Sequence, residues 1–120
     1  MSKSRLISLQ GSVFDLSTAP VKQPKSIKEG APVQKAQSAY EGTDNRAEAG
    51  MWESTAGSWN VNVAGYTEFC VLLEGQVIIH DEAGNENVFN AGDSLVMEDG
   101  FKGVWHVPNY VRKYFFIVNS

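Results

Sequence analysis

From Gly50 onward, short runs of β-branched and aromatic residues alternate with Gly, Asn and Asp at intervals of about ten residues. This spacing narrows the possible folds most, because such runs bounded by turn residues form strands joined by tight turns. Strict alternation places Trp59, Val61 and Val63 on one side of an expected strand. No run keeps a helical period, so the sequence predicts an all-β domain. The expected strands are 51–54, 58–63, 67–73, 76–80, 86–89, 94–97, 103–107 and 112–118.

Residues 1–49 have a different character and are expected to form an extended N-terminal arm. Three prolines, several lysines and a glycine fall between Ala19 and Pro32, a mixture that resists regular structure. The short apolar elements 6–9 and 13–16 could each add a strand to a sheet edge. Because 120 residues is close to the commonest domain size, residues 50–120 are expected to form one barrel domain.

Charge and composition exclude several classes of function. Residues 1–40 hold six basic and two acidic residues (+4), whereas residues 41–120 hold four basic and twelve acidic residues (−8). Such an acidic domain is not expected to bind nucleic acid. The sequence has no apolar run of membrane-spanning length and only one cysteine, Cys70, so no disulfide can form within the chain. We expect a cytoplasmic protein that does not contact membranes.

A family resemblance decides between a sandwich and a barrel. Glu68 is followed at the expected distance by Gly75, and Gly92-Asp93 is followed by Gly100. Over about seventy residues the chain resembles the small single-domain cupins of the ureidoglycine aminohydrolase-like subfamily. The resemblance implies an RmlC-like jelly-roll β-barrel with a pocket in its mouth, and it implies a homodimer. Further matching segments are 50–53, 68–70, 73–75, 100–105 and 111–114.

The same resemblance implies where a catalytic metal would be held. Metal-binding cupins use three histidines and one glutamate, since imidazole nitrogens and a carboxylate suit divalent transition metals. The glutamate position falls on Glu68, but the histidine positions fall on Asn62, Ala64 and Gly103. One ligand of four remains, and one carboxylate does not hold a transition metal tightly. We therefore expect no bound transition metal.

Other residues offer weaker metal sites. His106 follows Trp105, so if Trp105 points inward His106 points outward, and His80 closes a strand at a hairpin. Both histidines are expected at or near the surface. Glu98 and Asp99 lie near the expected barrel mouth and, with Glu68, could form an oxygen-rich site for Mg²⁺ or Ca²⁺. The alternative is a solvated acidic turn.

Alternation about Glu68 predicts the lining of the pocket. Tyr66, Cys70 and Leu72 share its inward face, whereas Phe69, Val71 and Leu73 point outward, toward a second sheet or a partner. Carboxylate, phenol, thiol and indole groups together suit a small molecule with a polar end. The candidate ligand-binding residues are Glu68, Tyr66, Cys70, Trp105, Trp59, Phe101 and, at the rim, Lys102.

The sequence thus predicts a metal-independent cupin that binds a small organic metabolite in the barrel mouth. Two alternatives stay open. One is a small-molecule hydrolase of the ureidoglycine aminohydrolase-like type, although that activity relies on metal ligands that are missing here. The other is a dimerisation module whose barrel is filled by its own side chains.

Overall fold

A computed structural model describes residues 5–120 and confirms the all-β prediction. Its strands pair in antiparallel fashion throughout. The strands of the described residues are β1 (Ile27–Glu29), β2 (Gln34–Glu41), β3 (Ala47–Asn62), β4 (Tyr66–Asp81), β5 (Glu86–Asn90), β6 (Ser94–Met97) and β7 (Lys102–Asn119). Three single-turn 3₁₀ helices, η1 (Gly11–Val13), η2 (Leu16–Thr18) and η3 (Thr43–Asn45), lie outside the strands.

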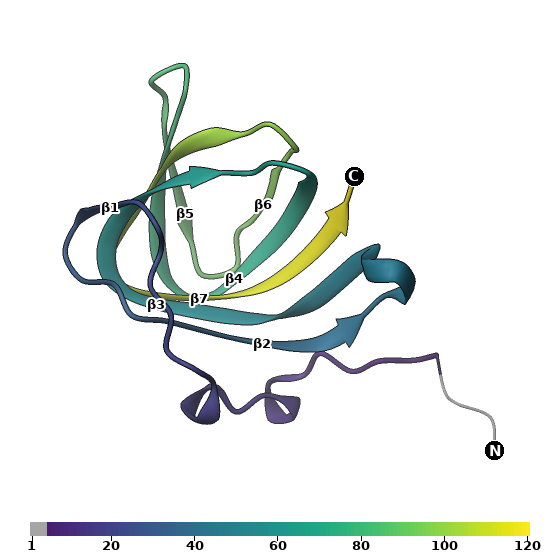
Figure 1. The fold of residues 1–120 in the computed structure, drawn as a ribbon. Helices are drawn as coiled ribbons and strands as arrows, with labels where there is room; N and C mark the ends of the chain where they lie inside the picture. Colours follow the sequence, from purple (N-terminus) through teal and green to yellow (C-terminus); the bar gives the residue numbers. More distant parts are fainter. Residues whose placement is uncertain (1–4) are drawn as a thin grey trace.

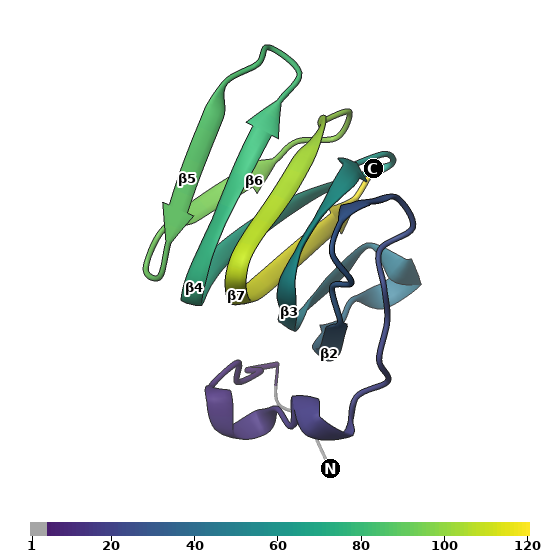
Figure 2. The same cartoon turned by 90° about the vertical axis from the view of Figure 1, so that its left-hand side faces the viewer.

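Three long strands, β3, β4 and β7, bend midway, so that each belongs to both layers of the sheet (Figure 1). The first half of β4 pairs with β6 and its second half pairs with β5. In the same way β3 pairs with β2 and then with β1, while β7 lies between β3 and β4. One layer is therefore β2–β3–β7–β4–β6 and the other is β1–β3–β7–β4–β5, named here the β6 layer and the β5 layer. Figure 2 shows β5, β4, β7 and β3 side by side. This is the jelly-roll arrangement that the family resemblance implies.

The sequence predicts two short strands in place of each of these long strands. The chain does not stop at these places: it bends, with register shifts between Thr55 and Gly57 and again between Leu72 and Ile78. Gly75 allows the bend of β4, because it has a φ of +79°. A Cβ atom at position 75 would also overlap the carbonyl oxygen of Tyr110 on the neighbouring strand β7. The two strands therefore touch backbone to backbone at this bend.

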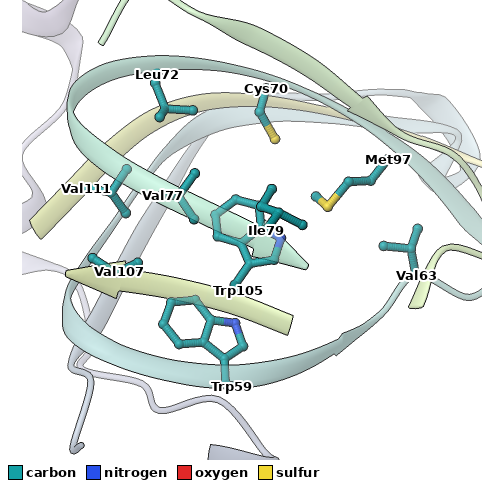
Figure 3. Packing of buried hydrophobic residues seen from close by; sticks show 10 residues of the cluster. All are labelled: Trp59, Val63, Cys70, Leu72, Val77, Ile79, Met97, Trp105, Val107 and Val111. Atoms are coloured by element: carbon teal, nitrogen blue, oxygen red, sulfur yellow. The ribbon is translucent and has the colours of Figure 1, made fainter. Parts of the chain in front are cut away.

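Inward-facing side chains of both layers fill the barrel with one apolar core (Figure 3). Trp59 and Trp105 are its largest members, and their rings stack with centroids 6.2 Å apart. Trp52 is half-buried and packs edge-on against Trp105 at 5.7 Å. The buried core consists of Trp59, Val63, Cys70, Leu72, Val77, Ile79, Met97, Trp105, Val107 and Val111.

The N-terminal arm differs from its prediction. Residues 6–9 and 13–16 form no strand, and the chain instead makes the turns η1 and η2 against the outer face of the β6 layer. Leu16 is buried, and the Phe14 ring lies 6.1 Å from that of Tyr114. Residues 34–41, which the sequence analysis placed in the arm, form β2 and pair with β3. The sheet therefore begins before residue 50.

The described residues include no helix with the length and hydropathy that a membrane crossing requires.

The bend at Gly75 gives a test of this packing. Gly75→Ala is expected to destabilise the fold by more than about 3 kcal/mol or to prevent folding, because a Cβ has no space beside Tyr110. Gly84→Ala is the matched control: its φ is +83°, but nothing lies within 4 Å of the added Cβ. It should cost only about 1–2 kcal/mol, from backbone strain alone. Urea unfolding measures both, and equal losses would contradict the packing argument.

Candidate functional site

A buried ion pair lies inside the barrel. The Nζ atom of Lys113 on β7 donates to Oε2 of Glu68 on β4 over 2.7 Å. Glu68 is 8% exposed and Lys113 is 6% exposed, so water cannot screen the two charges. Burying either charge alone would cost several kcal/mol, whereas a close pair offsets much of that cost. Glu68 therefore points inward, as predicted, and it has a cationic partner in the chain itself.

Two tryptophans surround the ammonium group. Nζ of Lys113 lies 4.6 Å from the ring centre of Trp52 and 4.5 Å from that of Trp105, so it contacts the π faces of both rings. Burial by itself lowers the pKa of Lys113, but the neighbouring Cys70 and Glu68 together raise it above its ordinary value. Lys113 is thus held as a cation. Among the described residues, the buried indole Nε1 of Trp105 has no hydrogen-bond partner.

Cys70 and Tyr66 complete the polar group. The thiol of Cys70 donates to Oε2 of Glu68 over 3.1 Å. Burial raises the pKa of Cys70 to about 12, despite the positive charge of Lys113, so the thiol stays protonated near neutral pH. Burial and then the charge of Glu68 also raise the pKa of Tyr66. These side chains therefore share one electrostatic environment, but a neutral thiol is a poor nucleophile.

Sequence reasoning missed Lys113 as a site residue. The sequence does contain a signal for an inward Lys113, because every second residue of β7 faces inward. The inward positions include Gly103, Trp105, Val107, Val111 and Lys113. Extending that alternation by eight residues from Trp105 predicts an inward lysine. The pairing of β7 with β4 then places Lys113 directly opposite Leu72, on the same inner face as Glu68.

The structure corrects two of the positions assigned to absent metal ligands. Asn62 and Ala64 are exposed, and the inward side chain between them is Val63, which is fully buried. Counting back from Glu68 fails because the strand does not continue: residues 63–65 form a loop that turns at Gly65, where φ is +89°. The inward side chains here are Val61, near the end of β3, and Val63, in the loop, and neither carries a ligand atom.

The third position, Gly103, is covered by a neighbouring ring. A Cβ atom there would lie 2.7 Å from Cζ of Phe101 and would overlap the carbonyl oxygen of His80. An imidazole has no space at this position. Residues 5–120 contain no group of three or more His, Cys, Asp or Glu side chains placed to hold a metal ion. Because the ammonium group of Lys113 already neutralises Glu68, the residues present do not fit the divalent metal of metal-binding cupins.

Asp99 has a structural role at the rim of the barrel mouth. Its carboxylate accepts hydrogen bonds from the backbone N–H of Gly65 at 2.8 Å and from the hydroxyl of Ser120 at 2.6 Å. Those hydrogen bonds, first that of Ser120, lower the pKa of Asp99. Glu98 is exposed, whereas Glu68 is buried beside Lys113. The oxygen-rich site suggested for these three carboxylates is therefore not formed in this structure.

Both histidines lie on the outside of the β5 layer. Nδ1 of His106 lies 2.5 Å from Oγ of Ser58, and Nε2 of His80 lies 3.2 Å from the carboxylate of Glu86. His106 stands opposite Ser58 and Ile78, which do not belong to the core. The outward orientation of His106 that alternation predicted is confirmed.

The remaining predicted pocket residues separate into inner and outer positions. Trp59 stacks on Trp105, and Phe101 packs against the core. Lys102 is exposed and pairs with the exposed Asn62, so it does not line the interior.

A cavity of about 190 Å³ opens beside Met97, between the edges of β5 and β6. Its lining is Ile79, Asp81, Asn87, Phe89, Leu95, Val96, Met97 and Phe101.

The EutQ-like cupin domain matches residues 41–115, well over half of the chain. The protein belongs to the EutQ-like cupin domain family. The match begins in β2, in keeping with the sheet that starts before residue 50. The finer resemblance to the ureidoglycine aminohydrolase-like subfamily stays a prediction.

Solved structures show which folds this EutQ-like cupin resembles. A protein of unknown function from Pseudomonas syringae pv. tomato has a TM-score of 0.73 and 24% identity, covering 83% of this chain and 43% of its own. Clostridium difficile EutQ has a TM-score of 0.65 and 19% identity, and the match covers 74% of this chain and 64% of the EutQ chain. A putative ethanolamine utilisation protein Q from Salmonella typhimurium has a TM-score of 0.65 and 17% identity, and the match covers 99% of this chain and 96% of the Salmonella chain. No curated relative matches the sequence.

These likenesses establish the fold alone, because all three identities lie below 25%. The chain spans less than two thirds of the Clostridium and Pseudomonas proteins.

The buried ion pair can be tested by its energetic cost. Lys113→Met leaves Glu68 as a buried charge without its partner, so we expect a loss of about 3–5 kcal/mol in the free energy of unfolding. Arg112→Met is the matched control. Arg112 neighbours Lys113 on β7, but its ion pair with Glu74 on β4 is far more exposed. That change should cost no more than about 1 kcal/mol. Denaturant unfolding measures both, and equal costs would contradict a desolvated pair. Adding Glu68→Leu to Lys113→Met should restore much of the loss.

The protonated thiol gives a test of reactivity. Native protein at pH 8 should react with a thiol reagent far more slowly than unfolded protein, because Cys70 is fully buried and its pKa is raised to about 12. Because the pKa of Cys70 is higher in the folded than in the unfolded chain, Cys70 contributes stability that is fully present below the ordinary thiol pKa. That contribution is lost as the pH rises towards 12. Rapid labelling of native protein at pH 8 would show that the thiol is accessible.

Proposed function

We propose that this EutQ-like cupin binds a small organic metabolite at its barrel mouth without using a metal. The observation that carries the proposal is the salt bridge between Lys113 and Glu68. It supplies the positive charge that a metal ion would otherwise bring to the retained carboxylate. The barrel thus has a fixed polar centre that is formed by its own side chains.

The cavity between β5 and β6 is the proposed ligand site. Its volume of about 190 Å³ fits a ligand of few atoms, and most of its lining is apolar. The amide of Asn87 and the carboxylate of Asp81 are its polar groups, but Asp81 already accepts hydrogen bonds from the backbone of Ala83 and Asn85. Met97 lines the cavity and lies opposite Glu68 on the inner face of the β6 layer. A compact ligand with an apolar body and one polar end suits this lining.

Metal analysis together with ligand screening tests the proposal. Protein as purified should hold far less than one equivalent of Mn, Fe, Ni or Zn, and EDTA should leave its melting temperature unchanged. Ligand-observed NMR with a library of small organic acids, amides and aromatic compounds should reveal binders. A stoichiometric metal that EDTA removes, with loss of stability, would refute the metal-free proposal. A library without any binder would refute the ligand-binding proposal.

A space-filling substitution locates the ligand. Leu95→Trp should fill the cavity and abolish binding, because Leu95 lines it. Val88→Trp is the matched control on β5, where the side chain is 46% exposed and not part of the lining. It should leave binding unchanged. Far-UV circular dichroism checks that both variants fold, and Leu95→Phe replaces Leu95→Trp if the larger ring prevents folding. Unchanged binding in the folded Leu95 variant would place the ligand elsewhere.

One observation favours the alternative of a ligand-free module. Trp52, Trp59 and Trp105 fill the barrel at centroid distances of 5.7–6.2 Å. A barrel filled in this way by its own side chains is suited to a rigid module for assembly. The NMR screen separates the two proposals, since the module predicts no specific binder that Leu95→Trp displaces.

A further inference from the structure

The indole N–H group of Trp105 stands out among the buried hydrogen-bond donors. Its Nε1 atom makes no hydrogen bond within residues 5–120, and the side chain is only 1% exposed. Buried polar groups are nearly always paired, because an unpaired one costs free energy. Nε of Arg112 is the other unpaired buried side-chain atom in this range, but its side chain is 33% exposed and forms an ion pair with Glu74. Trp105 therefore indicates that an acceptor comes from outside the chain.

The unpaired nitrogen lies close behind the wall of the cavity between β5 and β6. Trp105 on β7 stands directly opposite Ile79 on β4. In Figure 3 its Nε1 atom lies on the side of the ring toward Ile79 and Met97. Both of these residues line the cavity, and so does Phe101, which packs against the same core. Trp105 itself does not line the cavity, so side chains of the wall separate its N–H group from the space beyond.

Met97 is the part of this wall that moves most easily. Its unbranched side chain has three rotatable bonds, whereas the β-branched side chain of Ile79 is stiff at its first torsion. Met97 also ends β6, a strand of only four residues that pairs with β4. Rotation of the Met97 side chain would join the cavity to the indole N–H group of Trp105 without any movement of the long strands.

The buried charges beside Trp105 favour an uncharged ligand. Nζ of Lys113 lies 4.5 Å from the centre of the indole ring and 2.7 Å from the carboxylate of Glu68. These two charges are equal and opposite, so the group is already neutral. An anion or a cation that entered it would be a further buried charge without a partner, which is costly. A neutral oxygen atom needs only the one donor that Trp105 supplies.

We infer that the ligand of this cavity is an uncharged molecule whose carbonyl or amide oxygen accepts a hydrogen bond from Nε1 of Trp105. This inference rests on the proposed function, because it assigns the polar end of the ligand that the cavity binds. The apolar body of the ligand lies against Phe89 and Leu95, and its oxygen reaches inward past Met97. Trp105 thus selects the polar group of the ligand, whereas the cavity lining selects its size and shape.

Three ring compounds of similar size test the inference. Cyclohexanone carries a neutral acceptor oxygen, methylenecyclohexane has nearly the same shape without an acceptor, and cyclohexanecarboxylate carries a charged acceptor. NMR of ¹⁵N-labelled full chain follows binding through the indole N–H resonances. Cyclohexanone should move the indole proton of Trp105 downfield as the hydrogen bond forms, whereas methylenecyclohexane should not. Cyclohexanecarboxylate should bind at least about tenfold more weakly than cyclohexanone, because its charge finds no partner.

Two variants isolate the contribution of the N–H group. Trp105→Phe removes the donor and keeps an aromatic ring, so cyclohexanone should lose about fivefold or more in affinity. The affinity of methylenecyclohexane, which does not use the donor, should not fall. Trp59→Phe is the matched control, since it removes the indole that stacks on Trp105 in the same core, and it should leave this difference unchanged. Circular dichroism checks folding, and if Trp105→Phe fails to fold, the indole proton shift of the wild-type protein decides.

Leu95→Trp separates this inference from the proposed function. If a probe binds and Leu95→Trp abolishes its binding, the probe occupies the cavity. An unmoved Trp105 resonance, or a cyclohexanone affinity that Trp105→Phe leaves unchanged, then overturns the inference alone, as does tighter binding of cyclohexanecarboxylate. Absence of binding by all three probes, or binding that folded Leu95→Trp leaves intact, overturns the proposed function and the inference with it. A downfield Trp105 proton and a loss confined to cyclohexanone are the supporting result.

Discussion

The ion pair between Glu68 and Lys113 is the interaction on which the interior of this cupin depends. Each charge is tolerable inside an apolar barrel only because the other lies 2.7 Å away. The pair also constrains strand register, since a slip of β7 by one residue would turn Lys113 outward and leave Glu68 buried without a cation. The thiol of Cys70 and the rings of Trp52 and Trp105 then pack around the charged groups.

That pair also changes what the barrel can do chemically. In a metal-binding cupin, a glutamate like Glu68 would be one ligand among four, whereas here it has a lysine as its partner. The thiol beside it is neutral, and the described residues contain no cluster of metal-ligating side chains. The residues inside this barrel therefore do not fit the divalent metal of metal-binding cupins. The metal-free binding of a small molecule that we propose is consistent with these residues.

The long bent strands explain why inner and outer surfaces have separate roles. Because β3, β4 and β7 each cross both layers, one alternating pattern supplies the core and the opposite face of the same strands. Along β4, Glu68 and Cys70 point inward while Phe69 points outward. A substitution on one face should therefore leave the chemistry of the other largely unchanged. Gly75 is the position least tolerant of an added side chain, because β4 bends there directly against the backbone of β7.

The family resemblance indicated the cupin fold. The sequence by itself predicted most strand positions after residue 50, the inward orientation of Glu68 and Cys70, and the outward orientation of His106. These features follow from local alternation, which backbone geometry imposes on any strand. Only the tertiary structure placed Lys113 on Glu68, because the two residues are 45 positions apart and meet through strand register. It also showed that Asn62 is exposed at the end of β3 and that Ala64 lies in the loop that turns at Gly65. Asp99 accepts hydrogen bonds from both Gly65 and Ser120. Contacts between distant segments depend on how the whole chain packs, and local periodicity carries no record of that packing.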